Sequence, residues 1–297
     1  MKIRANNIDI EVEDTHPGDA TGRPVVLLIM GLGMQLIAWP PAMVQAIADA
    51  GFRVVRLDNR DIGLSQHFDN LGAPSLLWAG LKFRMGLSIR APYSIEDMAT
   101  DTVGVLDALK IARAHVVGVS MGGMVAQRVA VLAPSRVISL TSIMSSSGAR
   151  GLPEASPAVT RVLLSRPAGK GVQAAIDHTA RLLKAIGSPG FPTPDAELRE
   201  KVAAAAQRSF HPQGVLRQMV AIAADSTRAA ALAKVSAPTL VLHGRADPLV
   251  PMACGQDTAK RIPGARFESI EGMGHDLPPG VVERLLAFLM PHFKAHS

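Results

Sequence analysis

Short apolar runs alternate with helical patterns along the first half of the 297-residue chain. The runs are rich in β-branched residues and cover residues 25–30 (VVLLIM), 52–58 (FRVVRLD), 114–120 (AHVVGVS) and 137–144 (VISLTSIM). Helical patterns lie between them, at about 41–50, 95–109 and 121–132. Because strands that alternate with helices form βαβ units, the pattern predicts an α/β fold with a mostly parallel sheet.

The strand pattern stops over residues 148–234, where apolar residues recur at helical spacing, as at Val172, Ile176 and Leu183. Strands resume at 237–244 and 265–270, and a closing helix is expected over 281–293. We therefore predict a core of residues 1–147 and 235–297, interrupted by an all-helical insertion at 148–234. A second irregular stretch, residues 68–92, carries LLWAGLKF and is expected to form an extended loop at the same end of the sheet.

The composition is that of an ordinary globular protein, with 48% hydrophobic and 19% charged residues. The N-terminal residues contain no apolar core of a signal peptide, and no apolar stretch approaches the roughly 20 residues that cross a bilayer. The single cysteine, Cys254, excludes an internal disulfide and suits a reducing compartment. These features predict a cytoplasmic protein without a membrane partner.

The net charge of +6 is concentrated between residues 150 and 234, which contain twelve Lys or Arg against six acids. These charges are spread along the predicted helices, without a clustered basic tract or interleaved aromatics. The pattern favours a solvated helical surface over attraction of an anionic partner, and it gives nucleic-acid binding little support.

A glycine loop, Gly31-Leu32-Gly33, follows the first parallel strand, and Asp58 ends the next one. A dinucleotide site has this general order. Here, however, Leu36 stands where the third glycine is expected, and the WPP sequence at 39–41 delays the helix. Asp58 also comes 27 residues after Gly31, beyond the usual distance of about 20, and is expected in a structural turn. The loop therefore predicts no nucleotide cofactor.

The strand at 114–119 runs directly into a helix through Gly118-Val119-Ser120-Met121-Gly122, a GxSxG pattern. A serine on so sharp a turn needs glycine on both sides and presents its hydroxyl at a helix N-terminus. There, the amide of Met121 can stabilise a developing negative charge. The pattern predicts that Ser120 is a nucleophile.

An acid and a histidine follow later strands in suitable positions. Asp247 follows the strand TLVLHG, and His275 follows ARFESI in a loop between glycines and prolines. The chain order Ser, Asp, His is that of an α/β-hydrolase triad. His243 is expected to be a structural or rim residue. No pair of histidines or cysteines has metal-ligand spacing, so no metal site is predicted.

With these residues placed, the chain resembles the α/β-hydrolase superfamily over nearly its full length. The pieces MGLGMQLIAWP, LDNRDIGLS, HVVGVSMGG and GMGH resemble the esterase branch that includes aclacinomycin methylesterase. The resemblance implies an eight-stranded sheet flanked by helices, a helical cap formed by the insertion, no cofactor and hydrolysis of a carboxylic ester. It also implies that the amide of Leu32 is the second oxyanion donor. The chain departs from many superfamily members in having Met30-Gly31 instead of His-Gly.

Several methionines fall on loops or strand ends that should surround Ser120, and methionine adapts to irregular apolar shapes. We expect Gly31 and four of these methionines to form an apolar substrate pocket; the four are Met30, Met34, Met144 and Met273. Packing in the core is an equally good interpretation of these methionines. The predicted activity is that of a serine esterase acting on small, largely apolar esters. The alternatives are C–C bond hydrolysis, lactone opening or perhydrolysis on the same scaffold, or a small-molecule receptor without turnover.

Overall fold

The computed structural model describes residues 1–19, 22–165 and 167–297 and is built on one eight-stranded sheet. The strands are β1 (Lys2–Ala5), β2 (Ile8–Asp14), β3 (Val25–Ile29), β4 (Arg53–Leu57), β5 (Ala114–Val119), β6 (Val137–Ile143), β7 (Thr239–Gly244) and β8 (Arg266–Ile270). Their order is β1-β2-β4-β3-β5-β6-β7-β8. Only the pairs β1–β2 and β2–β4 are antiparallel. The predicted mostly parallel, eight-stranded α/β sheet is therefore confirmed.

The helices of the described residues are as follows: α1 (Pro41–Asp49), α2 (Leu76–Arg84), α3 (Ile95–Ala108), α4 (Met121–Leu132), α5 (Pro157–Leu164), α6 (Val172–Ile186), α7 (Asp195–Arg208), α8 (Pro212–Ala224), α9 (Arg228–Ala231), α10 (Met252–Arg261) and α11 (Pro279–Lys294). None of them combines the length and the apolar character that a bilayer span requires. The core helices begin and end within about two residues of the ranges that periodicity predicts.

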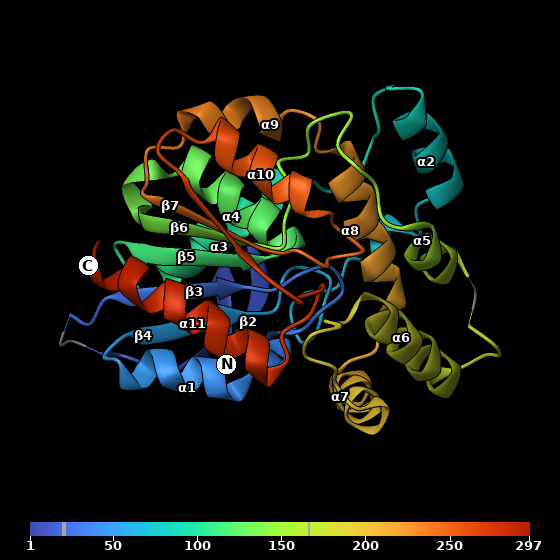
Figure 1. The fold of residues 1–297 in the computed structure, drawn as a ribbon, viewed down its shortest axis with the longest axis horizontal. Coiled ribbons are helices and arrows are strands. Elements are labelled where there is room, and N and C mark those ends of the chain that lie inside the picture. Colours follow the sequence, from blue (N-terminus) through green and yellow to red (C-terminus); the bar gives the residue numbers. More distant parts are fainter. Residues whose placement is uncertain (20–21, 166) are drawn as a thin grey trace.

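Both faces of the sheet are covered, and the central strands show why. Along β3, Val25, Leu27 and Ile29 belong to one buried cluster, whereas Val26 and Leu28 belong to the other. Successive side chains of a strand point to opposite faces, so a continuous apolar run suits a strand buried on both sides. Helices α3 and α4 contribute to the first cluster, and α1 and α11 to the second (Figure 1).

Helices α5 to α8, here called the insertion helices, lie between β6 and β7 in the sequence, within the predicted insertion. They gather with α2 at one end of the sheet (Figure 1). The residues that follow β3 contact α7 and α8, so this is the end at which the parallel strands terminate. Ligand sites of open α/β sheets lie at the same end.

The expectation of an extended loop over residues 68–92 is wrong, because this stretch contains α2. The Oγ of Ser75 accepts a hydrogen bond from the backbone N–H of Trp78 and caps the helix. Ala79 of α2 is buried, and α2 packs against α8. A single small residue facing a neighbouring helix gives too weak a periodicity for the sequence to reveal the helix.

Candidate active site

Ser120 is the single residue between the end of β5 and the start of α4, and it has φ 55° and ψ −121°. Residues other than glycine rarely adopt this backbone conformation, so the turn is strained. A Cβ on Gly118 would lie 2.1 Å from the carbonyl oxygen of Gly122, and one on Gly122 would lie 2.1 Å from that of Ile29. Strand and helix therefore approach closely only because both flanking positions are glycine.

The structure brings Ser120, His275 and Asp247 together, although they come from the ends of three different strands. The Nε2 of His275 lies 2.9 Å from the Oγ of Ser120, and its Nδ1 lies 2.7 Å from Oδ2 of Asp247. An ionised carboxylate can only accept, so the Nδ1–H donates to Asp247. The Nε2 of the neutral ring is then the acceptor that faces the serine hydroxyl.

Asp247 is held as an anion. Its Oδ1 accepts hydrogen bonds from the backbone N–H groups of Leu249, at 2.9 Å, and Val250, at 2.8 Å. Burial raises the pKa of this carboxyl, but interaction with His275 and the hydrogen bonds it accepts outweigh burial and lower the pKa to about 2. The carboxylate therefore stays charged where it orients the His275 ring.

His243 is fully buried on β7 and is not part of this hydrogen-bonded chain. Its Nε2–H donates to the carbonyl oxygen of Val250 at 2.7 Å, whereas Nε2 lies 3.6 Å from Oδ2 of Asp247. His243 thus anchors the same loop whose amides hold Asp247, in agreement with the structural role expected for it. This support was not visible in the sequence, because it depends on the path of the loop after β7.

The glycine loop after β3 passes beside the nucleophile candidate. A Cβ on Gly31 would lie 3.1 Å from the Cβ of Ser120, so the glycine loop and the serine turn approach closely. Gly33 has φ 68°, a conformation that favours glycine. Leu32 lies between these two glycines, and Met121 is the first residue of α4, whose N–H has no acceptor within the helix. Both predicted oxyanion donors therefore stand on segments that adjoin Ser120.

The insertion helices hold the loops that surround these residues. The backbone N–H of Gly33 donates to Oε1 of Gln218 on α8 at 3.0 Å. On the other side, the N–H of His275 donates to the carbonyl of Ile186 at 2.7 Å, and the N–H of Gly274 donates to Oγ of Ser188 at 2.8 Å. Sequence reasoning missed these contacts, because nothing local distinguishes Gln218 or Ser188 from other polar helix and loop residues.

The family model for the alpha/beta hydrolase fold matches residues 24–278. The chain belongs to the α/β-hydrolase family.

Among curated relatives, the hydrolase is 31% identical to rhodomycin D methylesterase DauP of Streptomyces sp. strain C5, over 94% of this chain and 93% of the relative. It is 32% identical to the putative carbamate hydrolase RutD of Variovorax paradoxus, over 87% and 86%. Among solved structures, the enol-lactonase of Burkholderia xenovorans LB400 matches with a TM-score of 0.70 and 24% identity, over 99% of this chain and 100% of that chain. At that identity the structural match is evidence for the fold alone.

Asp58 holds a structural turn in the hydrolase, as its sequence context predicts. Its Oδ1 accepts from the backbone N–H of Leu36 at 2.7 Å, and its Oδ2 accepts from that of Leu64 at 2.9 Å. Arg208 of α7 forms an ion pair with the same carboxylate at 2.7 Å. Both carboxylate oxygens of Asp58 therefore accept hydrogen bonds from groups of the protein.

The predicted pocket residues of the hydrolase lie at different depths. Met30, Met144 and Met273 are buried in the core cluster on one face of the sheet, and Met34 packs against that cluster while remaining partly exposed. Gly31 is buried beside Ser120. Contact between these side chains and a substrate stays a prediction.

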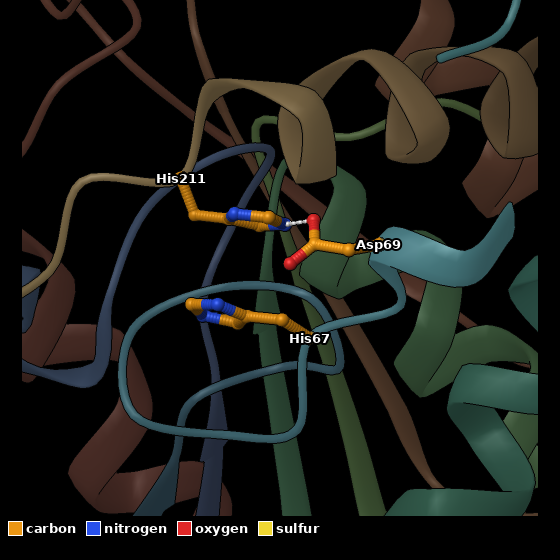
Figure 2. A group of neighbouring side chains, drawn as sticks. All are labelled: His67, Asp69 and His211. Carbon is orange, nitrogen blue, oxygen red and sulfur yellow. Dashed lines mark ion pairs between the residues drawn. The ribbon is translucent and has the colours of Figure 1, made fainter. Parts of the chain in front are cut away.

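A second group of polar residues, His67, Asp69 and His211, has ligand atoms within 4.8 Å of one another (Figure 2). The two imidazole rings are stacked, with centroids 3.9 Å apart and an angle of 8° between their planes. The nitrogen lone pairs therefore lie in parallel planes and do not converge on one point. In addition, Nη2 of Arg217 lies 2.9 Å from Nε2 of His211, which places a positive charge where a metal would bind. This arrangement is unsuited to a shared metal ion.

Proposed function

We propose that this α/β hydrolase cleaves carboxylic esters with Ser120 as nucleophile, His275 as general base and acid, and Asp247 as the orienting acid. The observation that carries the proposal is the hydrogen-bonded chain from Asp247 through His275 to the hydroxyl of Ser120. It ends on a residue held in a strained turn at a helix N-terminus, which matches the geometry of a nucleophile elbow.

In this mechanism, the Oγ of Ser120 bonds to the ester carbonyl carbon while Nε2 of His275 takes the hydroxyl proton. Asp247 keeps the ring in the correct tautomer and stabilises the imidazolium that forms. His275 then gives the proton to the departing alcohol, which leaves an acyl group on Ser120. A water molecule attacks this acyl-enzyme by the same route, with His275 as the base, and releases the acid and the free serine.

The negative charge on the carbonyl oxygen requires preorganised donors. We assign this role to the backbone N–H groups of Met121 and Leu32, which adjoin Ser120 from α4 and from the glycine loop. Each such donor contributes about 3 to 4 kcal/mol to the stabilisation of the transition state. Because both donors are backbone groups, Met30 in place of the usual histidine leaves the chemistry intact.

We further propose that the insertion helices act as a cap, residues 148–234, between core segments 1–147 and 235–297. Their hydrogen bonds to Gly33 and His275 hold the loops on both sides of Ser120 in place. The substrate would be a small, largely apolar ester that contacts Gly31, Met30, Met34, Met144 and Met273. The relative described as a methylesterase supports an ester, and the relative described as a putative carbamate hydrolase makes a carbamate the second candidate.

The test is a panel of p-nitrophenyl esters graded by acyl length, with a matched p-nitrophenyl carbamate. The protein should hydrolyse the esters, and a fluorophosphonate should add to Ser120 in an intact-mass spectrum. Ser120→Ala should lower kcat by about 10⁴ to 10⁶ and abolish labelling, whereas Ser135→Ala, at an exposed serine, should match the parent.

Labelling without turnover of any ester, but with turnover of the carbamate, would favour the second candidate. Absence of labelling together with unchanged hydrolysis in Ser120→Ala would exclude the triad. A folded parent that binds the esters but neither labels nor hydrolyses them would favour a receptor.

A further inference from the structure

Large apolar side chains are exposed in one short segment of this hydrolase. Among the described residues, seven exposed large hydrophobics lie between positions 71 and 87, against six in the rest of the structure. They are Leu71, Leu77, Trp78, Leu81, Phe83, Met85 and Leu87. Large apolar side chains that gather in one exposed segment often mark a site that binds a partner or a membrane. We call this set the α2 face.

The exposed apolar side chains are not needed to hold α2 in place. The helix is capped by Ser75 and is attached to the molecule through the buried Ala79 and its packing on α8. Leu77 remains 82% exposed and Trp78 63% exposed, on the side that the packing leaves free. In Figure 1, α2 stands at the outer edge of the molecule, apart from the layers that cover the sheet. The side chains are therefore available to a partner.

The charged side chains between positions 70 and 95 are all basic. Lys82, Arg84 and Arg90 are exposed, and none of them forms an ion pair or hydrogen bond with the residues that the structure describes. No acidic residue occurs between Asp69 and Glu96. A fourth cation, Arg150, donates to the carbonyl oxygen of Gly86 at 2.9 Å and so lies beside the same segment. Exposed apolar side chains and unpaired cations thus lie within the same segment.

We propose that the α2 face binds the surface of an anionic lipid bilayer. Tryptophan and leucine side chains on a helix enter the boundary between headgroups and acyl chains, and lysine and arginine attract anionic headgroups. The expectation of no membrane partner was based on the absence of a spanning segment, which does not bear on a helix that lies in the interface. Pairing of two copies through this face would bring six unpaired cations together without an acid to offset them, so a second copy is the poorer fit.

Binding is measured without substrate and therefore does not depend on the proposed ester hydrolysis. The probe is vesicles made of equal parts phosphatidylcholine and phosphatidylglycerol, compared with vesicles of phosphatidylcholine alone. The full chain should sediment with the anionic vesicles, more weakly with the neutral ones, and less as salt is raised. Of the two tryptophans, Trp39 is 0% exposed, so a blue shift of the fluorescence on binding reports Trp78.

Two double variants separate the electrostatic from the apolar contribution to vesicle binding. Lys82→Glu with Arg84→Glu should lower partitioning onto anionic vesicles at least roughly 25-fold, since each cation contributes about fivefold. Leu77→Ser with Trp78→Ser should lower it at least about tenfold on the same vesicles. Trp78→Phe should keep the binding and lose the fluorescence shift.

Two control variants lie away from α2. Lys2→Glu with Lys294→Glu makes the same charge change, and Leu132→Ser changes another exposed leucine; both should bind as the parent does.

The proposal is overturned if the folded parent does not bind anionic vesicles, or if it binds neutral ones equally well. It is also overturned if the control variants lose as much binding as the α2 variants. Sedimentation velocity provides the remaining test: a dimer that Leu77→Ser with Trp78→Ser dissociates would assign the α2 face to a second copy of the chain instead.

Discussion

The side-chain Oε1 of Gln218 accepts a 3.0 Å hydrogen bond from the backbone N–H of Gly33, and its Nε2 donates to the carbonyl oxygen of Arg60 at 3.0 Å. Gln218 is fully buried on α8. One insertion helix therefore fixes the glycine loop that carries the proposed oxyanion donor of Leu32. We therefore expect the position of this helix to affect the proposed catalysis.

Gln218→Leu should lower kcat for a p-nitrophenyl ester by about tenfold with little change in KM. The loop would lose its anchor, and a displaced donor stabilises the transition state less than a fixed one does. Gln127→Leu is the matched control, because Gln127 is also buried but bonds to Ser142 and Arg228 in the core. It should reduce stability without changing kcat per folded molecule. Equal kcat losses in both variants would contradict a positioning role for Gln218.

Asp247→Asn should reduce kcat by about 10⁴ while the fold is retained. The amide would favour the wrong tautomer of His275 and could not stabilise its cation. Steady-state kinetics with the preferred ester, together with far-UV circular dichroism, would measure this. Asp257→Asn serves as the comparison, since Asp257 bonds to Ser147 and Arg261 and not to a proposed catalytic group. A loss of less than tenfold for Asp247→Asn would assign the orienting acid elsewhere.

Gly122→Ala should prevent or strongly impair folding, with a lower Tm and less soluble protein. The added Cβ would meet the carbonyl oxygen of Ile29 at 2.1 Å, and neither the central strand nor the helix can move independently of the core. Gly80→Ala on α2 has open space around the new Cβ and should be neutral or stabilising by up to about 1 kcal/mol. Equal Tm values for Gly122→Ala and Gly80→Ala would show that the close approach of β3 and α4 does not require glycine at position 122.

Stability should fall between pH 6.5 and about pH 4. Burial, together with nearby positive groups, lowers the pKa of His115 from 6.5 to about 4, and burial likewise lowers that of His292 to about 4. In this range the unfolded chain takes up protons that the folded chain excludes, so acid favours unfolding. The slope approaches about 1.4 kcal/mol per pH unit for each group.

Urea unfolding at pH 7 and pH 5 would measure this loss, and His115→Gln should make it smaller. The partly exposed His16→Gln should leave the loss unchanged. A His115→Gln variant whose stability changes with pH as much as that of the parent would show that this histidine is not responsible.

The sequence alone predicted the elements that rest on local signals. The central strands are apolar on both faces, and the helices that cover them repeat every three to four residues, so β3, β5, α3 and α4 were evident from periodicity. Gly118 and Gly122 around Ser120 also constitute a local signal, because the steric demand of the turn lies within five consecutive residues. Helix α2 was missed, since it buries little and therefore shows no apolar face that periodicity could detect.

Ser120 was predicted from its GxSxG pattern, and Asp247 and His275 from their places after later strands. Parallel strands bring such places to one edge of the sheet. Their distances and the support of the glycine loop by Gln218 were decided only by the tertiary structure. These contacts join residues separated by up to 185 positions in the chain. A pairing over such a separation leaves no periodic trace in either partner, because it depends on how whole elements pack and not on the conformational preferences of neighbouring residues.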